Sequence, residues 1–353
     1  MVQGAETQKA SESAVGRFQP STTSNQPVEF HESKEELQEM LHTMILIRQF
    51  EDKVYEMYTR GRIGGYCHMN HGEEATIVGS IHPLRPQDWV VSYYREHGHI
   101  IARGSEPRRV MAELFGRQDG VSRGRGGSMH LFDAKRHFMG GYGIVAGNFP
   151  LALGTGFSSK YRKADEITLC LTGEGATANG AFHESMNMIG LWHLPVITLI
   201  VNNLYGMGTT VERSQANPEL SKRGEMYAMH GIKIDGMDVM QVKRAMEDCM
   251  RRASEGEPSL VDAITYRYRG HSVADPARYR TQEEVQSWRD QDPIERFYRQ
   301  LLEAGMITEE DRKSIDARVE AEVQEAVEFA ENSPQPDPAG LLDFLYVDPP
   351  PNV

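Results

Sequence analysis

Two stretches of the chain place polar residues directly after apolar runs. The run from Ile167 to Leu171 leads into Thr172 and Gly173-Glu174-Gly175, and the run from Val196 to Val201 leads into Asn202-Asn203. Such runs are typical of buried parallel strands, whose carboxyl ends meet at one edge of a sheet. A carboxylate and a carboxamide at that edge supply hard oxygen ligands, which suit Mg²⁺ bound together with a diphosphate. The helix expected after Gly175 would direct its N-terminal N–H groups to the same place.

The same corner also matches another type of site. Gly173, Gly175 and Ala178 satisfy the pattern G-x-G-x-x-A of a Rossmann fold that binds a dinucleotide. That fold also needs an acidic residue at the end of the following strand, for the cofactor ribose, and here that strand ends in Asn202-Asn203. The pattern therefore favours a metal-bridged diphosphate, with a nicotinamide-dependent oxidoreductase as the alternative from a different class.

The elements that would position these residues indicate an α/β protein. Residues 64–264 alternate glycine-rich corners, short β-branched runs and helical segments, which predicts a central, mostly parallel sheet flanked by helices. A long amphipathic helix is expected near the start, because Ser33 and Glu36 form a capping-box pattern before apolar residues at helical spacing. These apolar residues are Leu37, Leu41, Met44, Ile47, Phe50, Val54 and Met57.

The composition of the two ends suggests three parts. Residues 1–32 are rich in Ser, Thr and Gln and are expected to form a flexible tail. Residues 33–282 would form the α/β domain that binds the diphosphate, together with its N-terminal helix. Residues 283–353 are charged and helix-forming and then proline-rich, and we expect a helical extension. Its apolar tail would pack back on its own domain or against a partner.

Composition limits the kind of partner. The 353 residues carry a formal charge of −13, so nucleic acid and anionic membrane surfaces are excluded as expected partners. No apolar run approaches the roughly 18 to 20 residues that a bilayer requires. The odd number and wide spacing of Cys67, Cys170 and Cys249 indicate a reducing compartment. That compartment would be the cytoplasm in a bacterium, and a mitochondrial matrix or a plastid is left open.

The chain resembles a known enzyme family. Gly173-Glu174-Gly175, 26 further residues and Asn202-Asn203 resemble the thiamine diphosphate motif G-D-G-x(about 26)-N-N. Further matches are "GYCHMNHGEEA", "YYREHG", "GRGGSMHLF", "GGYGIVAGNFPLALG", "NNLYGMGTTVERS" and "YRYRGHSVADPARYR". Together they are similar to the α subunit of the first, decarboxylating component of 2-oxo acid dehydrogenase complexes, in particular the pyruvate type. Two residues depart from the family pattern: Glu174 replaces the usual Asp, and Glu73 stands where Gln is common.

The resemblance implies a role for each matching residue. Glu174, Asn203 and the Tyr205 carbonyl would bind Mg²⁺, and the Gly175 and Ala176 backbone would meet the diphosphate of thiamine diphosphate. The remaining implied residues are Tyr94 and Arg95 for the diphosphate, Gly143 and Val145 for the aminopyrimidine ring, and His68 and His271 as catalytic residues at the entrance, His271 also contacting the cofactor. Arg267 and Arg269 flank His271 in sequence and would order its loop.

The resemblance also implies a reaction and partners. The expected activity is decarboxylation of pyruvate with transfer of the acetyl group to the lipoyl group of an acyltransferase component, which feeds acetyl-CoA formation. An acetoin-cleaving or branched-chain 2-oxo acid enzyme stays open as the alternative. In split enzymes of this type, a glutamate of a separate β subunit activates the aminopyrimidine ring. This chain is too short for both halves of the site, so the resemblance implies an α2β2 heterotetramer.

Overall fold

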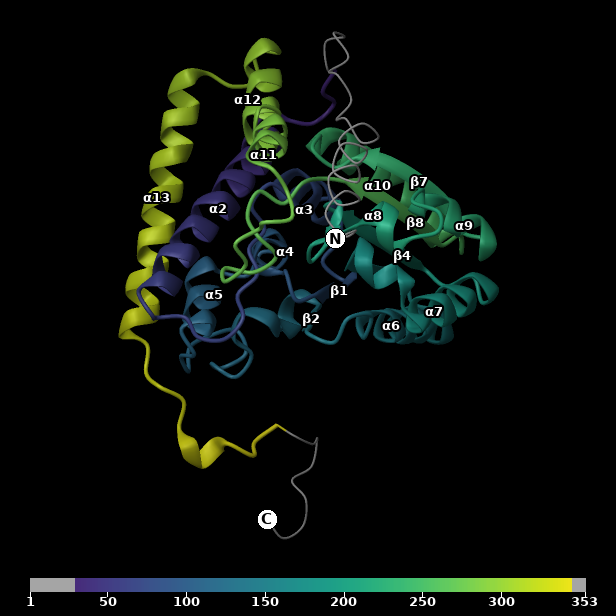
Figure 1. Cartoon of the computed structure of the whole chain (residues 1–353), viewed down its shortest axis with the longest axis horizontal. Helices are drawn as coiled ribbons and strands as arrows, with labels where there is room; N and C mark the ends of the chain where they lie inside the picture. Colours follow the sequence, from purple (N-terminus) through teal and green to yellow (C-terminus); the bar gives the residue numbers. More distant parts are fainter. Residues whose placement is uncertain (1–28, 345–353) are drawn as a thin grey trace, which may run out of the picture.

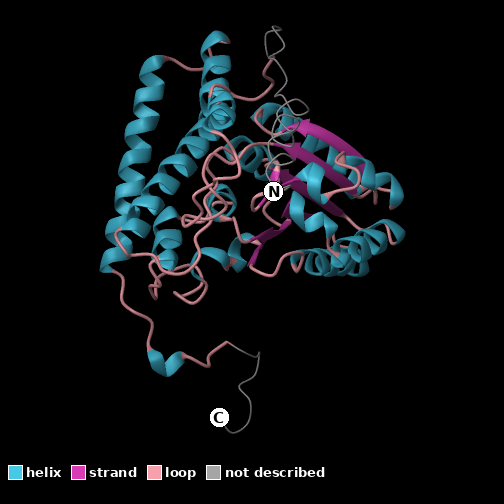
Figure 2. Cartoon of the chain, in the orientation of Figure 1, coloured by secondary structure: helices cyan, strands magenta, loops and turns pink. Residues whose placement is uncertain are grey.

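The computed structural model describes residues 29–344. The predicted N-terminal tail lies almost wholly outside the described residues, as does the last part of the C-terminal tail. Six parallel strands form the central sheet, in the order β2-β1-β3-β4-β8-β7 (Figures 1 and 2). The strands are β1 (Trp89–Tyr93), β2 (Phe138–Tyr142), β3 (Thr168–Gly173), β4 (Val196–Asn202), β7 (His230–Asp235) and β8 (Ser259–Ile264). A hairpin of β5 (Tyr205–Gly206) and β6 (Thr209–Thr210) follows β4.

The observed sheet confirms the predicted α/β fold. In chain order its strands run 2-1-3-4-6-5, which differs from the 3-2-1-4-5-6 order of the Rossmann sheet. The register pairs Gly173 with Val201 in β3 and β4, and Asn202 with Ile264 in β4 and β8. The residues that follow these three strands therefore emerge side by side at one edge of the sheet.

Helices cover both faces of the sheet, because each central strand alternates its side chains between two apolar cores. Leu169 and Leu171 join a core with the helices α2, α3 and α10, whereas Cys170 joins a second core with α6 and α7. The helices of the domain are α2 (Lys34–Thr59), α3 (Glu74–Ile81), α4 (His97–Ala102), α5 (Pro107–Leu114), α6 (Asn148–Arg162), α7 (Gly180–Leu191), α8 (Val211–Ser214), α9 (Arg223–Met226) and α10 (Val239–Ser254).

The first described helix matches the sequence prediction. The Ser33 hydroxyl accepts a hydrogen bond from the Glu36 backbone N–H at 3.1 Å and caps α2. All seven apolar residues predicted for one stripe of this helix are buried. None of the helices formed by residues 29–344 combines the length and the apolar character that crossing a bilayer requires.

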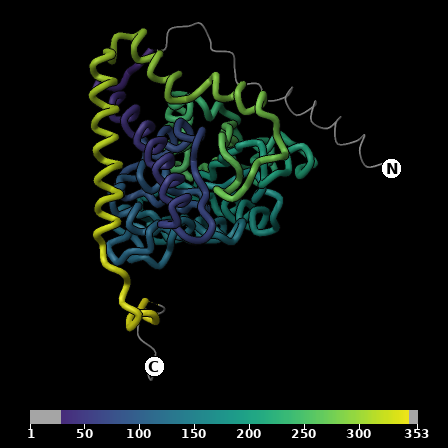
Figure 3. Tube along the Cα trace, turned by 60° about the vertical axis from the view of Figure 1, so that its left-hand side comes forward, coloured from purple at the N-terminus to yellow at the C-terminus, as the bar shows by residue number. Residues whose placement is uncertain are grey.

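The C-terminal helices pack against the start of the chain. They are α11 (Gln282–Arg289), α12 (Pro293–Glu303) and α13 (Glu309–Asn332). The long helix α13 lies beside α2 and α5 (Figures 1 and 3), and its Val319 and Val323 are buried in the same core as α2. We propose that these helices form the C-terminal extension of the α/β domain. Beyond them, Phe344 is 67% exposed, and the guanidinium groups of Arg123 and Arg125 lie over its ring.

Candidate active site

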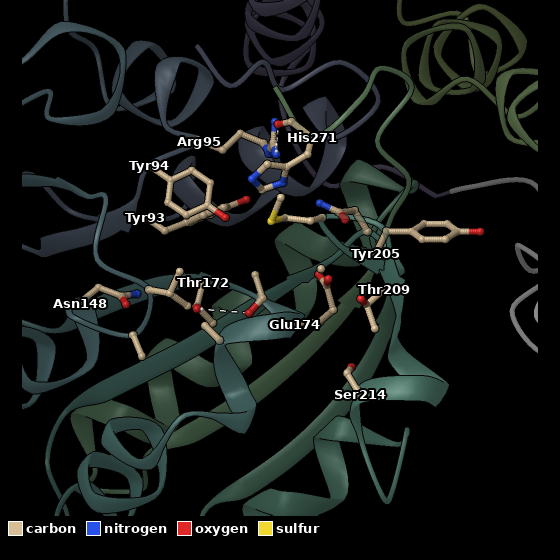
Figure 4. A pocket seen from close by; sticks show the side chains of 18 of the residues that line it. Tyr93, Tyr94, Arg95, Asn148, Thr172, Glu174, Tyr205, Thr209, Ser214 and His271 are labelled. Carbon is tan, nitrogen blue, oxygen red and sulfur yellow. Dashed lines mark hydrogen bonds between the residues drawn. The ribbon is translucent and has the colours of Figure 1, made fainter. Parts of the chain in front are cut away.

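A cavity of about 330 Å³ lies at the carboxyl-terminal edge of β1, β3 and β4 (Figure 4). Its lining includes nine residues that the sequence predicted for the site: Tyr94, Arg95, Val145, Glu174, Gly175, Ala176, Asn203, Tyr205 and His271. Two other predicted residues, Gly143 and His68, do not line it. Gly143 lies beside the His130 ring, where an added Cβ would stand 3.3 Å from the ring, and the half-exposed Val145 reaches the cavity from the same loop.

Glu174 is the first residue after β3, and its side chain is buried in the cavity wall. Burial raises the pKa of its carboxyl group to about 6, and the nearby Arg267 guanidinium partly opposes this rise. The helix predicted after Gly175 begins five residues later than Gly175, at Gly180. A 3₁₀ turn over Glu174–Ala178 comes first, and α7 follows with Asn179 as its cap. The Thr177 hydroxyl donates to the Glu174 carbonyl at 2.8 Å and stabilises this turn.

The two asparagines after β4 face different surroundings. The Asn202 amide donates to Asp262 Oδ1 at 2.9 Å, and its oxygen accepts from the Leu204 N–H at 3.2 Å. Leu204 has a φ of 72°, so Asn202 stabilises a tight left-handed turn. Asn203 lines the cavity: its amide donates to Glu73 Oε1 at 2.9 Å, and its oxygen accepts from Arg267 at 3.3 Å. Asn202 is therefore structural, whereas Asn203 presents an oxygen to the site.

Tyr205 contributes its backbone to the cavity rather than its phenol. The side chain points away (Figure 4), and its hydroxyl donates to the Glu284 carboxylate at 2.8 Å. The Tyr205 carbonyl oxygen accepts from the Arg267 guanidinium at 3.3 Å, as the Asn203 oxygen does. Two neutral oxygens therefore already hold a cationic group on this side of the cavity.

The donor chemistry of this wall fits a hard cation. One buried carboxylate, one amide oxygen and one backbone carbonyl are the ligand types that Mg²⁺ takes alongside a phosphate. Within residues 29–344 no cluster of three or more His, Cys, Asp or Glu side chains could hold a metal ion. A metal in this cavity would therefore need the Asn203 and Tyr205 oxygens in addition to Glu174.

Arg95 and His271 form the opposite wall (Figure 4). Arg95 is 1% exposed and donates to the backbone oxygens of Met69 at 2.8 Å and His271 at 2.9 Å. Its Nε atom is buried without a hydrogen-bond partner and lies 3.9 Å from the Glu73 carboxylate. Arg95 therefore both faces the cavity and holds the backbone of His271.

The two predicted histidines pack edge to face. His68 packs against Tyr94, with ring centroids 4.5 Å apart, and against His271 at 5.0 Å. Burial and the charge of Arg95 lower the pKa of His271 to about 3 and that of His68 to about 2. Both rings are therefore neutral near pH 7 in this structure. His271 faces the cavity, and His68 supports it from behind.

Two residues of the site were not among those predicted to bind or react. Arg267, expected only to order a loop, is 1% exposed and lines the cavity, where it donates to Asn203 and Tyr205. Glu73 is fully buried, and it orients the Asn203 amide so that the oxygen faces Arg267. Burial raises the pKa of the Glu73 carboxyl group. Arg267 could have been found as a charged residue soon after the apolar run of β8. Glu73 could have been found as a departure from the family pattern.

Comparison with known proteins identifies a family. Residues 42–339 match the family described as Dehydrogenase E1 component. The pyruvate dehydrogenase E1 component subunit alpha of Rhizobium meliloti (strain 1021) is 44% identical over 318 residues, which cover 90% of each chain. The protein of the same name from Rickettsia bellii (strain RML369-C) is 42% identical over 89% of this chain and 97% of its own length.

A plant relative shows the same similarity. The chloroplastic pyruvate dehydrogenase E1 component subunit alpha-3 of Arabidopsis thaliana is 41% identical over 324 residues, which cover 90% of this chain and 76% of the relative. The family match spans the whole sheet and every residue of the cavity wall described above. The chain therefore belongs to the Dehydrogenase E1 component family, as its sequence motifs implied.

Proposed function

We propose that this chain is the α subunit of a pyruvate dehydrogenase, which uses thiamine diphosphate and Mg²⁺ to decarboxylate pyruvate oxidatively and to pass the acetyl group to a lipoyl group. Relatives that carry this name are 41% to 44% identical to the chain over about nine-tenths of its length. The observation that carries the proposal is the cavity, which has three oxygen atoms suited to bind a metal on one wall and a buried arginine on the other.

Three buried cysteines without disulfides fit a reducing compartment.

Each wall suits one part of the cofactor. Bound thiamine diphosphate would supply a nucleophilic carbon and an electron sink for the loss of CO₂ from a 2-oxo acid. Glu174, Asn203 Oδ1 and the Tyr205 carbonyl would hold Mg²⁺, and the Gly175 and Ala176 backbone would meet the diphosphate. Tyr94 and Arg95 would bind the diphosphate from the other wall, since a guanidinium group bonds two oxygens at once.

The loops at the entrance would serve the ring and the reacting carbon. Val145 lines the cavity, and we assign its main chain and that of Gly143 in the same loop to the aminopyrimidine ring. His271 would hold or move a proton near the substrate, because its neutral ring can both accept and donate a hydrogen bond. His68 would fix the His271 ring.

A β subunit would complete the site. Among the described residues that line the cavity, Glu174 is the single carboxylate, and it is assigned to the metal. The carboxylate that activates the aminopyrimidine ring in this family must then come from another chain. We propose an α2β2 heterotetramer that delivers its product to a lipoyl-bearing acyltransferase.

Reconstitution tests this proposal. The purified chain with pyruvate, thiamine diphosphate and Mg²⁺ should decarboxylate at least about 100-fold more slowly than the chain co-expressed with its β subunit, because the isolated chain lacks the activating acid. Co-expression of Glu174→Ala with the β subunit is the matched control, and it should assemble without restoring turnover. Fast turnover by the isolated chain would refute the split site.

A further inference from the structure

A second, polar cavity of about 440 Å³ lies on the other side of the segment that carries His271. Arg269 and Arg280 reach it from this segment, and Arg289 reaches it from α11. Residues 266–280 thus separate two cavities, because Arg267 and His271 line the first while Arg269 and Arg280 line the second. The first cavity is assigned to the cofactor, and the second has no part in the proposed reaction.

The three arginines have few anionic partners. Among the described residues, Arg280 and Arg289 form no ion pair with any carboxylate, and Arg269 reaches only Asp52, at 3.4 Å. Asp52 is shared, since it also bonds His71 at 2.9 Å. The Nε atoms of Arg269 and Arg280 are buried without a hydrogen-bond partner. The cavity is therefore lined by three guanidinium groups with little carboxylate charge to offset them.

One carboxylate lines the cavity, but its oxygens are already used. Asp275 accepts from the His271 N–H at 2.6 Å, from the Ala277 N–H at 2.9 Å and from the Tyr279 hydroxyl at 2.9 Å. These hydrogen bonds outweigh its desolvation and hold the pKa of Asp275 below its ordinary value. The cavity therefore keeps an excess of positive charge in a chain whose formal net charge is −13.

We propose that this second cavity binds a small dianionic phosphate compound. Guanidinium groups bond phosphate oxygens in pairs and keep their charge at every physiological pH. The volume lies in the range of about 300 to 1,000 Å³ that small-molecule sites occupy. A dianion would offset the excess positive charge that the three guanidinium groups keep over Asp275 and Asp52.

Occupancy of this site acts on the His271 loop through Arg280. The Arg280 guanidinium donates to the backbone oxygens of Arg267 and of Arg269, the latter at 2.6 Å. Arg267 in turn donates to the Tyr279 hydroxyl at 2.8 Å and to the metal-site oxygens. A ligand that fixes Arg280 therefore stabilises the segment that places Arg267 and His271 in the first cavity.

Calorimetric titration of the assembled α and β subunits tests the proposal. With thiamine diphosphate and Mg²⁺ in excess and ionic strength held constant, inorganic phosphate and sulfate should bind saturably, whereas acetate should not. The double variant Arg269→Gln/Arg289→Gln should bind phosphate at least about tenfold more weakly. Arg278→Gln is the matched control, because Arg278 is an exposed arginine of the same segment outside the cavity lining, and it should stay within about twofold of the parent. Arg289→Glu is a second test variant. It should fold, because the Arg289 side chain is exposed.

Hydrogen–deuterium exchange localises the binding without any need for turnover. Phosphate should slow exchange in peptides that cover residues 266–289 and leave residues 172–176 unchanged, with or without thiamine diphosphate. Failure of the cofactor to bind would count against the proposed function alone. Binding that is equal in the double variant and the parent, equal for acetate and phosphate, or without protection of residues 266–289 would overturn the second site.

Discussion

The two walls of the first cavity are built in different ways. The strand-end wall, formed by Glu174 and Asn203, follows β3 and β4, whose backbones are joined by continuous parallel pairing. The loop wall is the part of the opposite wall that His271 forms. It follows β8 at a greater distance, and its segment is held by arginine side chains that donate to backbone oxygens. The first wall is fixed by the sheet itself, and the second is fixed by a few arginine contacts. We therefore expect changes in the strand-end wall to abolish binding, and changes in the loop wall to slow turnover.

Glu174→Ala should have the largest effect. The change removes the one carboxylate that we propose for the metal and would leave the cofactor's charge unbalanced, a loss of roughly 3 to 5 kcal/mol for a broken buried charge pair. Thiamine diphosphate in excess Mg²⁺ should then bind more than about 100-fold more weakly in calorimetric titration of the assembled protein.

Glu174→Asp is the control for this change. It keeps the carboxylate but shortens its reach toward the proposed metal, and Mg²⁺ requires ligands at roughly 2.0 to 2.1 Å. We expect binding within about tenfold of the parent, or roughly 1.4 kcal/mol. Equal affinity of the Ala variant and the parent would show that Glu174 does not bind the metal.

His271→Ala should slow turnover while binding is retained. Loss of a group that positions or transfers a proton should reduce lipoyl-dependent acetyl transfer roughly 10- to 100-fold. The cofactor dissociation constant should change less than about threefold, because Arg95 and the strand-end wall stay in place. Steady-state kinetics and titration of the same sample separate the two effects. A large loss of affinity without a loss of turnover at saturation would reverse the assignment of the two walls.

Asn202→Ala and Asn203→Ala should separate stability from binding within the strand-end wall. Asn202 supplies a hydrogen bond to the buried Asp262, whose pKa burial raises to about 6. Its loss should lower the free energy of unfolding by about 1 to 3 kcal/mol, measured in urea, and leave cofactor affinity nearly unchanged. Asn203→Ala should instead weaken cofactor binding in the same titration. If both variants behave alike, the distinction between the two asparagines is wrong.

Acid should lower the stability of the protein through His271 in the loop wall, and this is the smallest of the four effects. The pKa of His271 is about 3 in the folded chain and ordinarily 6.5, so the unfolded chain binds more protons below pH 6.5. Stability should therefore fall as the pH drops below about 6.5, and His271→Asn should reduce this dependence. Thermal unfolding of the cofactor-free protein between pH 5 and 8 would measure it, with His193→Asn at an exposed position as the control. An unchanged pH slope in His271→Asn would contradict the expectation.

The strand-end wall could be predicted from sequence, because continuous apolar runs and the polar residues that end them are local signals. The apolar runs before Glu174 and Asn202 gave the strands, and parallel pairing implied that their ends meet. The helix start at Ser33 was predictable for the same reason, since its cap and its apolar stripe lie within a few turns.

The loop wall could not be predicted in this way, because its contacts join residues that are distant in sequence. Arg95 reaches His271 across 176 positions. No pattern within a short window reports such a pair, and the resemblance to the family assigned Arg267 to the His271 loop but not to the cavity. The 3₁₀ turn after Glu174 was also missed, since a glycine-rich corner is compatible with either type of helix.

The contact of α2 with α13 has a consequence for how the protein folds as it is made. The hydrogen bond between His42 and Glu322 joins residues that are 280 positions apart. Synthesis runs from the N-terminus, so part of the apolar stripe of α2 stays uncovered until α13 leaves the ribosome. Contacts of such long sequence separation form late and slowly. Nascent chains that stop before Glu309 should therefore bind chaperones through α2 and aggregate when released.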